Sequence, residues 1–379
     1  MKRLTCLTCV LALAVTAVVG CKKEDQPAAP AEKIKPAEPP KPVEPPKPAP
    51  LTGAALLQSY QDCMFTSANT HDIEKSKTCW SQDASLAMPG MPESKGDAIT
   101  EHLQHFVAAF PDLKIEPVMT LMNGQTVATV VRLSGTNTGP MMDKPATGKP
   151  FAMIGLTFDE LDEQGKVKHA THVLDIPTMM GQLGMAPPKA KFRALAEAAA
   201  PTPPIIATDS PTERDNLALV GKWGDAVAKA DWKTADPLMA DDVVLVDSGM
   251  PTDVKGKKEF EKTMDVGMKA FPDGKWTPVN RFAAGDYVVT LGTFTGTNTG
   301  PMPGMIDKPT GKSVTGTGAE VVQVVGGKVA KVWWFGNGAE MAMQLGLMPP
   351  PGAPGKQAAP GKEGAPTPAK KEAAPAKGK

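Results

Sequence analysis

The sequence is short of cysteine and carries no net charge of either sign. Its 379 residues include 5 cysteines, and 41 basic residues balance 41 acidic ones. A chain without net charge creates no overall field that attracts polyanions, so a nucleic-acid partner is not expected. The sequence also contains no phosphate-binding loop, no serine-nucleophile motif and no His-Glu-x-x-His arrangement. The histidines form no arrangement that is typical of a metal site, so we expect no metal site.

The first 21 residues are typical of an export signal. A positive start at 2–3 is followed by an apolar run over 4–19, which is shorter than the ~20 residues that cross a bilayer. The segment then ends in Val-Val-Gly-Cys, which resembles the lipobox of bacterial lipoproteins. This resemblance implies cleavage before Cys21, acylation of Cys21 and a lipid anchor in the bacterial cell envelope. By resemblance to bacterial sorting rules, Lys22 in place of Asp after this cysteine favours the outer membrane, on the side that faces the periplasm.

Proline is concentrated between and around two blocks of ordinary composition. Residues 22–50 are a proline-rich linker, which as a polyproline spacer extends by ~3.1 Å per residue. Residues 189–207 form a second linker, and 350–379 form a Pro/Ala/Lys tail that we expect to be disordered. The sequence therefore predicts two domains, domain one at 51–188 and domain two at 208–349.

The two blocks are copies of one another. The sequence Gly-Thr-Asn-Thr-Gly-Pro-Met occurs at 135–141 and again at 296–302, followed each time by Asp-Lys-Pro and Thr-Gly-Lys. Further matching segments keep an offset close to 160 residues, so the duplication spans the whole domain.

Each copy begins with helical patterns and continues with strand patterns. In domain one, apolar residues follow helical spacing at 56–64, 71–80 and 96–110, and β-rich runs follow at 127–134, 151–161 and 167–174. The same order recurs in domain two. Helices first and an antiparallel sheet afterwards indicate an α+β domain.

Cys63 and Cys79 are the cysteines that remain after the leader. In an oxidising compartment such a pair favours a disulfide, which would join the first helix to the end of the second. Two buried free thiols are the alternative.

Both copies resemble a known family. The ordered set is Ala-Phe-Pro-Asp, a Gly-Thr-x-x-Gly strand end, a Thr-Gly-Lys segment, a Gly-Lys turn and a late Gln-Leu-Gly. It is similar to the SnoaL-like polyketide cyclase and ester cyclase family of the nuclear transport factor 2-like superfamily. The resemblance implies two repeated cone-shaped domains, each a curved antiparallel sheet wrapped around three helices and an apolar pocket. Because the family is commonly dimeric through the sheet, it also implies an internal pseudo-dimer of the two domains.

The resemblance also implies chemistry without any cofactor, in which a pocket Asp acts as general acid and base. The matching position, seven residues before the Gln of Gln-Leu-Gly, is Asp175 in domain one and Asn337 in domain two. Asp175 is therefore the candidate catalytic residue, and the alternative is a strand-end carboxylate that caps the next turn. The residues expected to line a ligand pocket are Asn137, His169, Thr171, Asn298, Trp333, Phe335 and Asn337. Their alternatives are turn-forming asparagines and ordinary core aromatic residues.

Three functions remain open at this point. The first is a membrane-tethered tandem protein that binds a small apolar or amphipathic ligand in its cones, without full cyclase activity. The second is a cyclase, isomerase or hydrolase that uses Asp175, and whether the chain is an enzyme stays undecided. The third is a structural or partner-binding module, which filled cones would favour.

Overall fold

The computed structural model describes residues 49–88, 90–141, 144–186, 191–198, 200–303, 306–336 and 338–348. The predicted anchor Cys21, the linker at 22–50 and the tail at 350–379 lie outside these residues, apart from positions 49 and 50. Within the described part of the chain, no helix is both long and apolar enough to cross a membrane.

Domain one forms a seven-stranded mixed sheet together with a strand from the second linker. Its elements are α1 (Gly53–Asn69), α2 (Ile73–Thr78), β1 (Trp80–Ala87), β2 (Ser94–Lys95), α3 (Asp97–Ala109), β3 (Lys114–Asn123), β4 (Thr126–Thr136), β5 (Pro150–Leu161), β6 (Val167–Leu174) and α4 (Ile176–Gln182), and the linker adds β7 (Ile205–Ile206). The strand order is β2-β1-β6-β5-β4-β3-β7. The pairs β1–β6 and β3–β7 are parallel, so the sheet is not purely antiparallel as expected.

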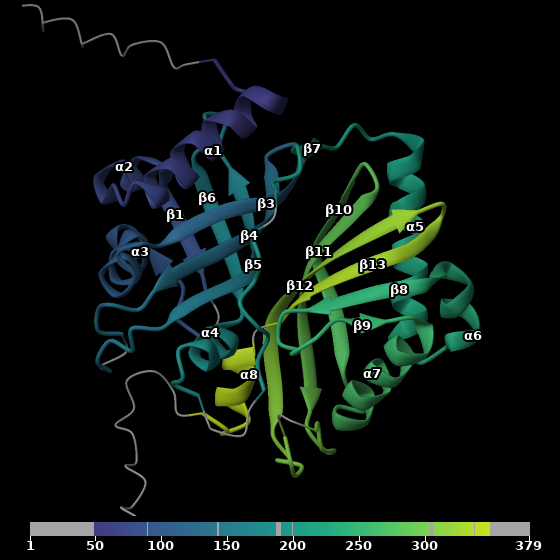
Figure 1. Cartoon of the computed structure of the whole chain (residues 1–379). Coiled ribbons are helices and arrows are strands. Elements are labelled where there is room, and N and C mark those ends of the chain that lie inside the picture. Colours follow the sequence, from purple (N-terminus) through teal and green to yellow (C-terminus); the bar gives the residue numbers. More distant parts are fainter. Residues whose placement is uncertain are drawn as a thin grey trace, which may run out of the picture. The chain divides into compact units, whose positions relative to one another are not determined.

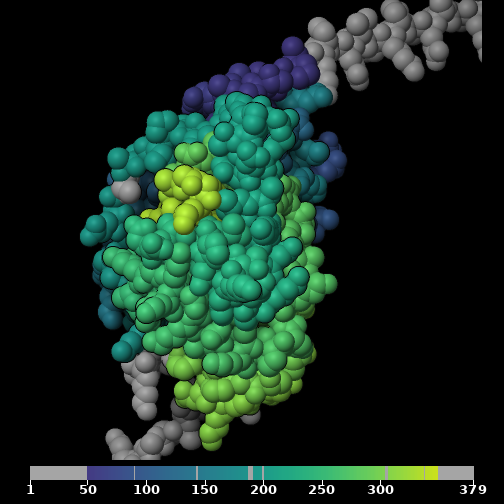
Figure 2. Space-filling view, turned by 90° about the vertical axis from the view of Figure 1, so that its right-hand side faces the viewer, coloured from purple at the N-terminus to yellow at the C-terminus, as the bar shows by residue number. Residues whose placement is uncertain are grey.

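Domain two repeats this arrangement in a six-stranded sheet. Its elements are α5 (Pro211–Val227), α6 (Trp232–Ala235), a 3-10 turn (Asp236–Leu238), β8 (Met239–Asp247), β9 (Val254–Lys255), α7 (Lys257–Ala270), β10 (Lys275–Ala284), β11 (Tyr287–Thr297), β12 (Ser313–Val325), β13 (Lys328–Phe335) and α8 (Gly338–Gln344). The strand order is β10-β11-β12-β13-β8-β9, with β8 and β13 parallel. Each domain thus has a fourth, short helix after its last strand, where the sequence pattern predicts three. Figure 2 shows the side of the molecule on which α5, α6 and α7 lie.

The repeated Gly-Thr-Asn-Thr-Gly sequence closes the end of the third helix in each domain. The Asn137 side chain donates to the carbonyls of Ala109 and Gly139, and its Oδ1 accepts from the backbone N–H and the hydroxyl of Thr147. Asn298 makes the same set of four contacts in domain two. Gly139 has to be glycine, because a Cβ there would lie 2.0 Å from the carbonyl oxygen of Ala108. The motif therefore binds a loop to a helix end that would otherwise leave carbonyls unpaired.

The helices of each domain cover one face of its sheet, and the opposite faces of the two sheets pack together (Figure 1). One buried apolar cluster joins them, with contributions from β3 to β6 of domain one and from β10 to β13 of domain two. Within it the rings of Phe158 and Phe282 lie 6.2 Å apart, centroid to centroid. We call this the outer face of each sheet, and the face toward the helices the interior face. Because side chains alternate along a strand, the register then assigns every strand residue to one face.

Cys63 in α1 and Cys79 at the end of α2 are joined by a disulfide, with 5.5 Å between their Cα atoms. The bond fixes the two helices that cover one end of the domain-one interior. Trp80, the first residue of β1, follows it directly.

Candidate functional site

The interior face of the domain-one sheet carries a group of polar side chains among apolar ones. Thr129 of β4 pairs with Thr157 of β5, and Thr157 pairs with His172 of β6. Asp159 lies two residues further along the same face of β5. On the helix side, Tyr60 of α1 faces these strands. We call Tyr60, Thr129, Thr157, Asp159 and His172 the polar cluster.

Asp159 is the centre of the polar cluster. The Tyr60 hydroxyl donates to Asp159 Oδ2 over 2.5 Å, and His172 Nε2 lies 3.8 Å from Asp159 Oδ1. Tyr60 and Asp159 are each 1% exposed. Asp159 Oδ1 and the hydroxyls of Thr129 and Thr157 make no hydrogen bond of normal geometry to the described residues. The Thr157 hydroxyl is nevertheless close enough to Asp159 to lower the pKa of that carboxyl group, and both threonines lower the pKa of Tyr60. Buried polar atoms without partners are rare in native proteins, because each costs about 1–3 kcal/mol of desolvation.

Burial sets the protonation of the polar cluster. It raises the pKa of Asp159 to about 7, against the Tyr60 hydrogen bond, which favours the carboxylate. Burial also lowers the pKa of His172 to about 4, helped by the nearby His102, and it raises the pKa of Tyr60 well above its usual range. Near neutral pH the site therefore holds a neutral imidazole, a phenol and a carboxyl group divided between its acid and carboxylate forms.

His102 links the polar cluster to the third helix. It lies on α3, and its Nε2 is 2.7 Å from Ser94 Oγ at the short strand β2. Partial burial lowers the pKa of His102, and the neighbouring His105 lowers it further. His102 is also close enough to His172 to lower the pKa of that histidine.

Domain two places different residues at the same interior positions. The registers align Asp159 with Val322, Thr157 with Glu320, and His172 with Trp334. Val322 and Trp334 belong to, or pack against, an apolar cluster that includes Trp223 and Phe260. Glu320 forms an ion pair with Arg281 at 3.5 Å. The interior of domain two is therefore mostly apolar and packed.

Two hollows open on the surface of the part of the chain that the structure describes. One of about 280 Å³ lies among α2, β1 and the start of α3. Another of about 110 Å³ lies beside α5 and β10. Neither is lined by Tyr60, Asp159 or His172. Both hollows are therefore separate from the polar cluster, and the apolar pocket expected in each cone stays a prediction.

Most of the predicted pocket residues lie elsewhere. Asn137 and Asn298 are fully buried, and all their hydrogen-bonding capacity is used within the repeated loop. Trp333 and Phe335 are on the outer face, in the cluster between the sheets, while Trp334 faces the interior. His169 and Thr171 alternate with the interior residues Ala170 and His172, so they too are on the outer face. Asn337 lies outside the described residues.

Asp175 is at the N-terminus of α4, where its Oδ1 accepts from the Thr178 N–H over 3.4 Å. Its Oδ2 is buried and has no partner among the described residues. Burial raises the pKa of Asp175, against Thr178 and Arg193. This is the helix-capping role that the sequence left as an alternative, and the residue is separate from the polar cluster.

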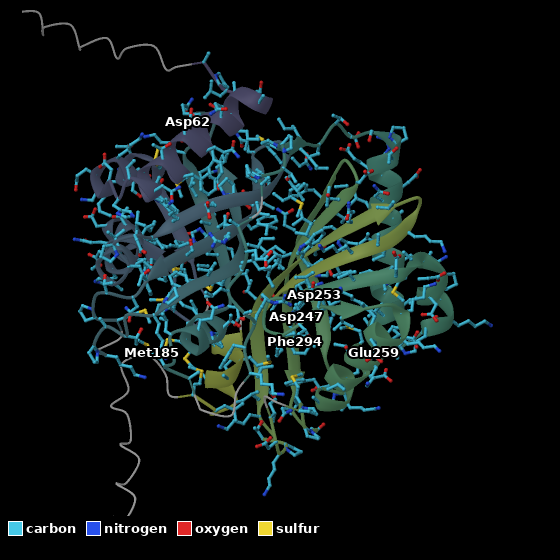
Figure 3. The ribbon with its side chains drawn as sticks, in the orientation of Figure 1. Asp62, Met185, Asp247, Asp253, Glu259 and Phe294 are labelled. Carbon is cyan, nitrogen blue, oxygen red and sulfur yellow. A yellow bond between two sulfur atoms is a disulfide. The ribbon has the colours of Figure 1, made fainter. Side chains whose placement is uncertain are left out.

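Asp175 instead belongs to a charged group shared by both domains. Burial raises the pKa of Asp247 to about 6, and Asp175 adds to that shift. Arg193 of the second linker donates to Asp253 Oδ1 over 2.7 Å and to the Asp247 carbonyl over 2.9 Å. Figure 3 labels Asp247 and Asp253 in domain two. The group therefore holds the linker to domain two.

None of the five residues of the polar cluster was among the site residues expected from the sequence. Tyr60 was one of four apolar positions at helical spacing, and Asp159 fell inside a predicted strand. Comparison of the two copies could have identified Asp159, because the residue aligned with it in domain two, Val322, is apolar. Across the described residues, no group of three or more His, Cys, Asp or Glu side chains is placed to hold a metal ion.

Comparison with known proteins identifies the fold of both copies. The family profile described as SnoaL-like polyketide cyclase matches residues 54–183 and 218–345. Among solved structures, AclR from Streptomyces galilaeus is 27% identical, with 36% of this chain and 84% of AclR covered and a TM-score of 0.32. IdmH from Streptomyces antibioticus is 25% identical, with 34% and 98% covered and a TM-score of 0.31. A SnoaL-like protein from Jannaschia sp. CCS1 is 22% identical, with 37% and 97% covered and a TM-score of 0.34. No curated protein matches the chain.

Proposed function

The chain belongs to the SnoaL-like polyketide cyclase family, with two copies of the domain in tandem, and we propose that domain one binds a small amphipathic molecule in its interior. Domain two acts as the packed partner that covers the outer face of domain one. The ligand places a polar end at the polar cluster and an apolar body among the surrounding core residues.

One observation carries this proposal. Three buried oxygen atoms on one face of one sheet, Asp159 Oδ1 and the hydroxyls of Thr129 and Thr157, make no hydrogen bond of normal geometry to the described residues. A group that entered the interior and bonded to them would remove their desolvation cost. Ordered water would also satisfy them, and an experiment separates the two.

The chemistry of the polar cluster selects a hydrogen-bond acceptor. A buried carboxylic acid that is neutral near pH 7 donates a hydrogen bond, and the pKa of about 7 keeps much of Asp159 in that form. The threonine hydroxyls are further donors. A ketone, ester or phenol oxygen on an otherwise apolar molecule therefore fits best.

The same pKa favours acid–base catalysis as a second candidate function. A group whose pKa lies near the working pH both accepts and donates protons efficiently, and Asp159 meets this condition. Asp175, the candidate from the family resemblance, remains the alternative base. Turnover of 4-nitrophenyl acetate separates them, since activity lost in Asp159→Asn but kept in Asp175→Asn assigns the reaction to the polar cluster.

Binding is tested with prodan, a naphthalene that carries a ketone and becomes brighter and bluer in apolar surroundings. We expect the full chain to bind it, and Asp159→Val to weaken binding about tenfold, because one buried hydrogen bond is worth about 1–3 kcal/mol. Valine is the residue that domain two has at this position. Binding of 2-dimethylaminonaphthalene, which lacks the ketone, should change little.

Val322→Ala in domain two is the matched control and should leave prodan affinity unchanged. Absence of prodan binding, or equal affinity of Asp159→Val and the unchanged chain, would contradict the proposal and favour a structural module whose cluster is hydrated.

We further propose that the protein is tethered to the bacterial envelope through acylated Cys21, which the lipobox resemblance supports. Replacing Cys21 with Ser and fractionating cells tests this. The tether is refuted by a variant that stays with the membrane as fully as the unchanged protein.

A further inference from the structure

The hollow of about 280 Å³ in domain one lies between the end of α2, the start of β1 and the start of α3. Its lining includes Lys77, Trp80, Ala84, Asp97, Ile99 and Thr100. Its rim is therefore polar and charged, while Ala84 and Ile99 are buried core residues, 2% and 3% exposed. A polar rim above an apolar floor matches an amphipathic molecule better than a wholly polar one.

The floor of this hollow belongs to the same apolar cluster as Tyr60. Ala84, Ile99 and Tyr60 are all members of it. Across the sheet, Leu86 pairs with Ala170, and Ala170 pairs with Asp159. Ala84 lies two residues before Leu86 on the same face. With strands ~4.8 Å apart and ~3.3 Å per residue, the step from Ala84 to Asp159 is roughly 12 Å, about the length of a small bicyclic molecule.

Two interior positions between the hollow and Asp159 carry smaller residues in domain one than in domain two. The aligned positions of Ala84 and Ala170 are Val243 and Val332 in domain two, and both valines are buried. Because these two alanines are smaller than the valines of domain two, a molecule that enters domain one has less side chain to displace. Both alanines lie on the interior face between this hollow and Asp159.

We infer that this hollow is the entrance to the domain-one interior, through which an acceptor-bearing apolar molecule passes between Ile99 and Ala84 to reach Asp159. The inference rests on the proposed function and adds the route. The ligand enters oxygen first, and its trailing end is left near Trp80 and the polar rim.

The test measures how fast prodan associates with the full chain in a stopped-flow instrument. We expect Ala84→Val and Ala170→Val each to slow association about tenfold, because added methyl groups crowd a packed interior. Ile99→Ala should speed association several-fold by widening the entrance, so the inference stays testable if a valine variant does not fold. Val332→Ala in domain two is the matched control and should leave the rate unchanged.

The outcomes separate the route from the function. If the unchanged chain binds no prodan, the proposed function fails and the route fails with it. If prodan binds, depends on Asp159, and yet associates at the same rate in Ala84→Val and Ile99→Ala, the function stands and the entrance is overturned. Rates that change in opposite directions in these two variants support the entrance.

Discussion

Replacing Asp159 with Asn should change how the stability of the protein depends on pH. The pKa of the native carboxyl is about 7, against 3.8 for the free group. Native protein therefore holds this proton more tightly than unfolded protein does. The free energy of unfolding must then fall as pH rises from about 4 to about 7, and stay level above that.

The size of the effect follows from the shift. About three pKa units at ~1.36 kcal/mol per unit give roughly 4 kcal/mol as an upper figure. Asparagine keeps the shape and an oxygen that can accept from Tyr60, but it does not titrate. Relative to the unchanged chain, Asp159→Asn should therefore gain stability by up to about 4 kcal/mol between pH 4.5 and pH 8. The pKa of His172 is lowered to about 4, which adds the opposite slope, but that histidine is present in both proteins.

Urea unfolding followed by circular dichroism, at fixed ionic strength and several pH values, measures this difference. Asp62→Asn, at an exposed position of α1, is the control and should give a level difference. A difference between Asp159→Asn and the unchanged chain that stays constant within about 1 kcal/mol over this range would falsify the assignment of Asp159 as a buried carboxyl group.

Three further outcomes test other parts of the structure. Asn137→Ala should lower the free energy of unfolding by about 2–4 kcal/mol, because it leaves several buried loop groups unpaired; a loss below about 0.5 kcal/mol, measured by urea unfolding, would contradict the loop geometry. Replacing both disulfide cysteines with serine should cost about 3 kcal/mol, as expected for a loop closed over 16 residues, and an unchanged melting temperature would count against the bond. Arg193→Ala should raise the pKa of Asp247 further, since the guanidinium now lowers it; a carboxyl NMR titration with the same midpoint refutes that contact.

Sequence patterns located the duplication and most of the long strands after the third helix, and two of the missed strands share a cause. The predicted strand at 167–174 has the bounds of β6, and the third helix of domain one ends at Ala109, one residue before the predicted end at 110. The strands β3 and β10 were not predicted, because Pro117 and Pro278 interrupt their apolar patterns. In the sheet each proline lies at a bulge in the register, where a missing N–H is tolerated.

The faces of the strands could not be assigned from the sequence. Strand β5 is buried at nearly every position, because its interior face meets helices and its outer face meets domain two. Period-two alternation of polar and apolar residues, which normally marks the core face, is therefore lost. For the same reason Trp333 and Phe335 seemed equally suited to a pocket and to a core, and the contact between the sheets decides between them.

The two copies are alike where their sheets pack together, and they differ on their interior faces. The outer faces of both sheets contribute to one shared apolar cluster, and the repeated loops make matching hydrogen bonds. The interior row across three strands is Asp159, Ala170 and Leu86 in domain one, and Val322, Val332 and Leu245 in domain two. An all-apolar row is the simpler solution for stability, since a buried carboxyl group near pH 7 costs folding energy. Domain one keeps that costly residue in a fold whose other copy shows it can be replaced by valine, so the carboxyl group is better explained by binding or chemistry than by folding.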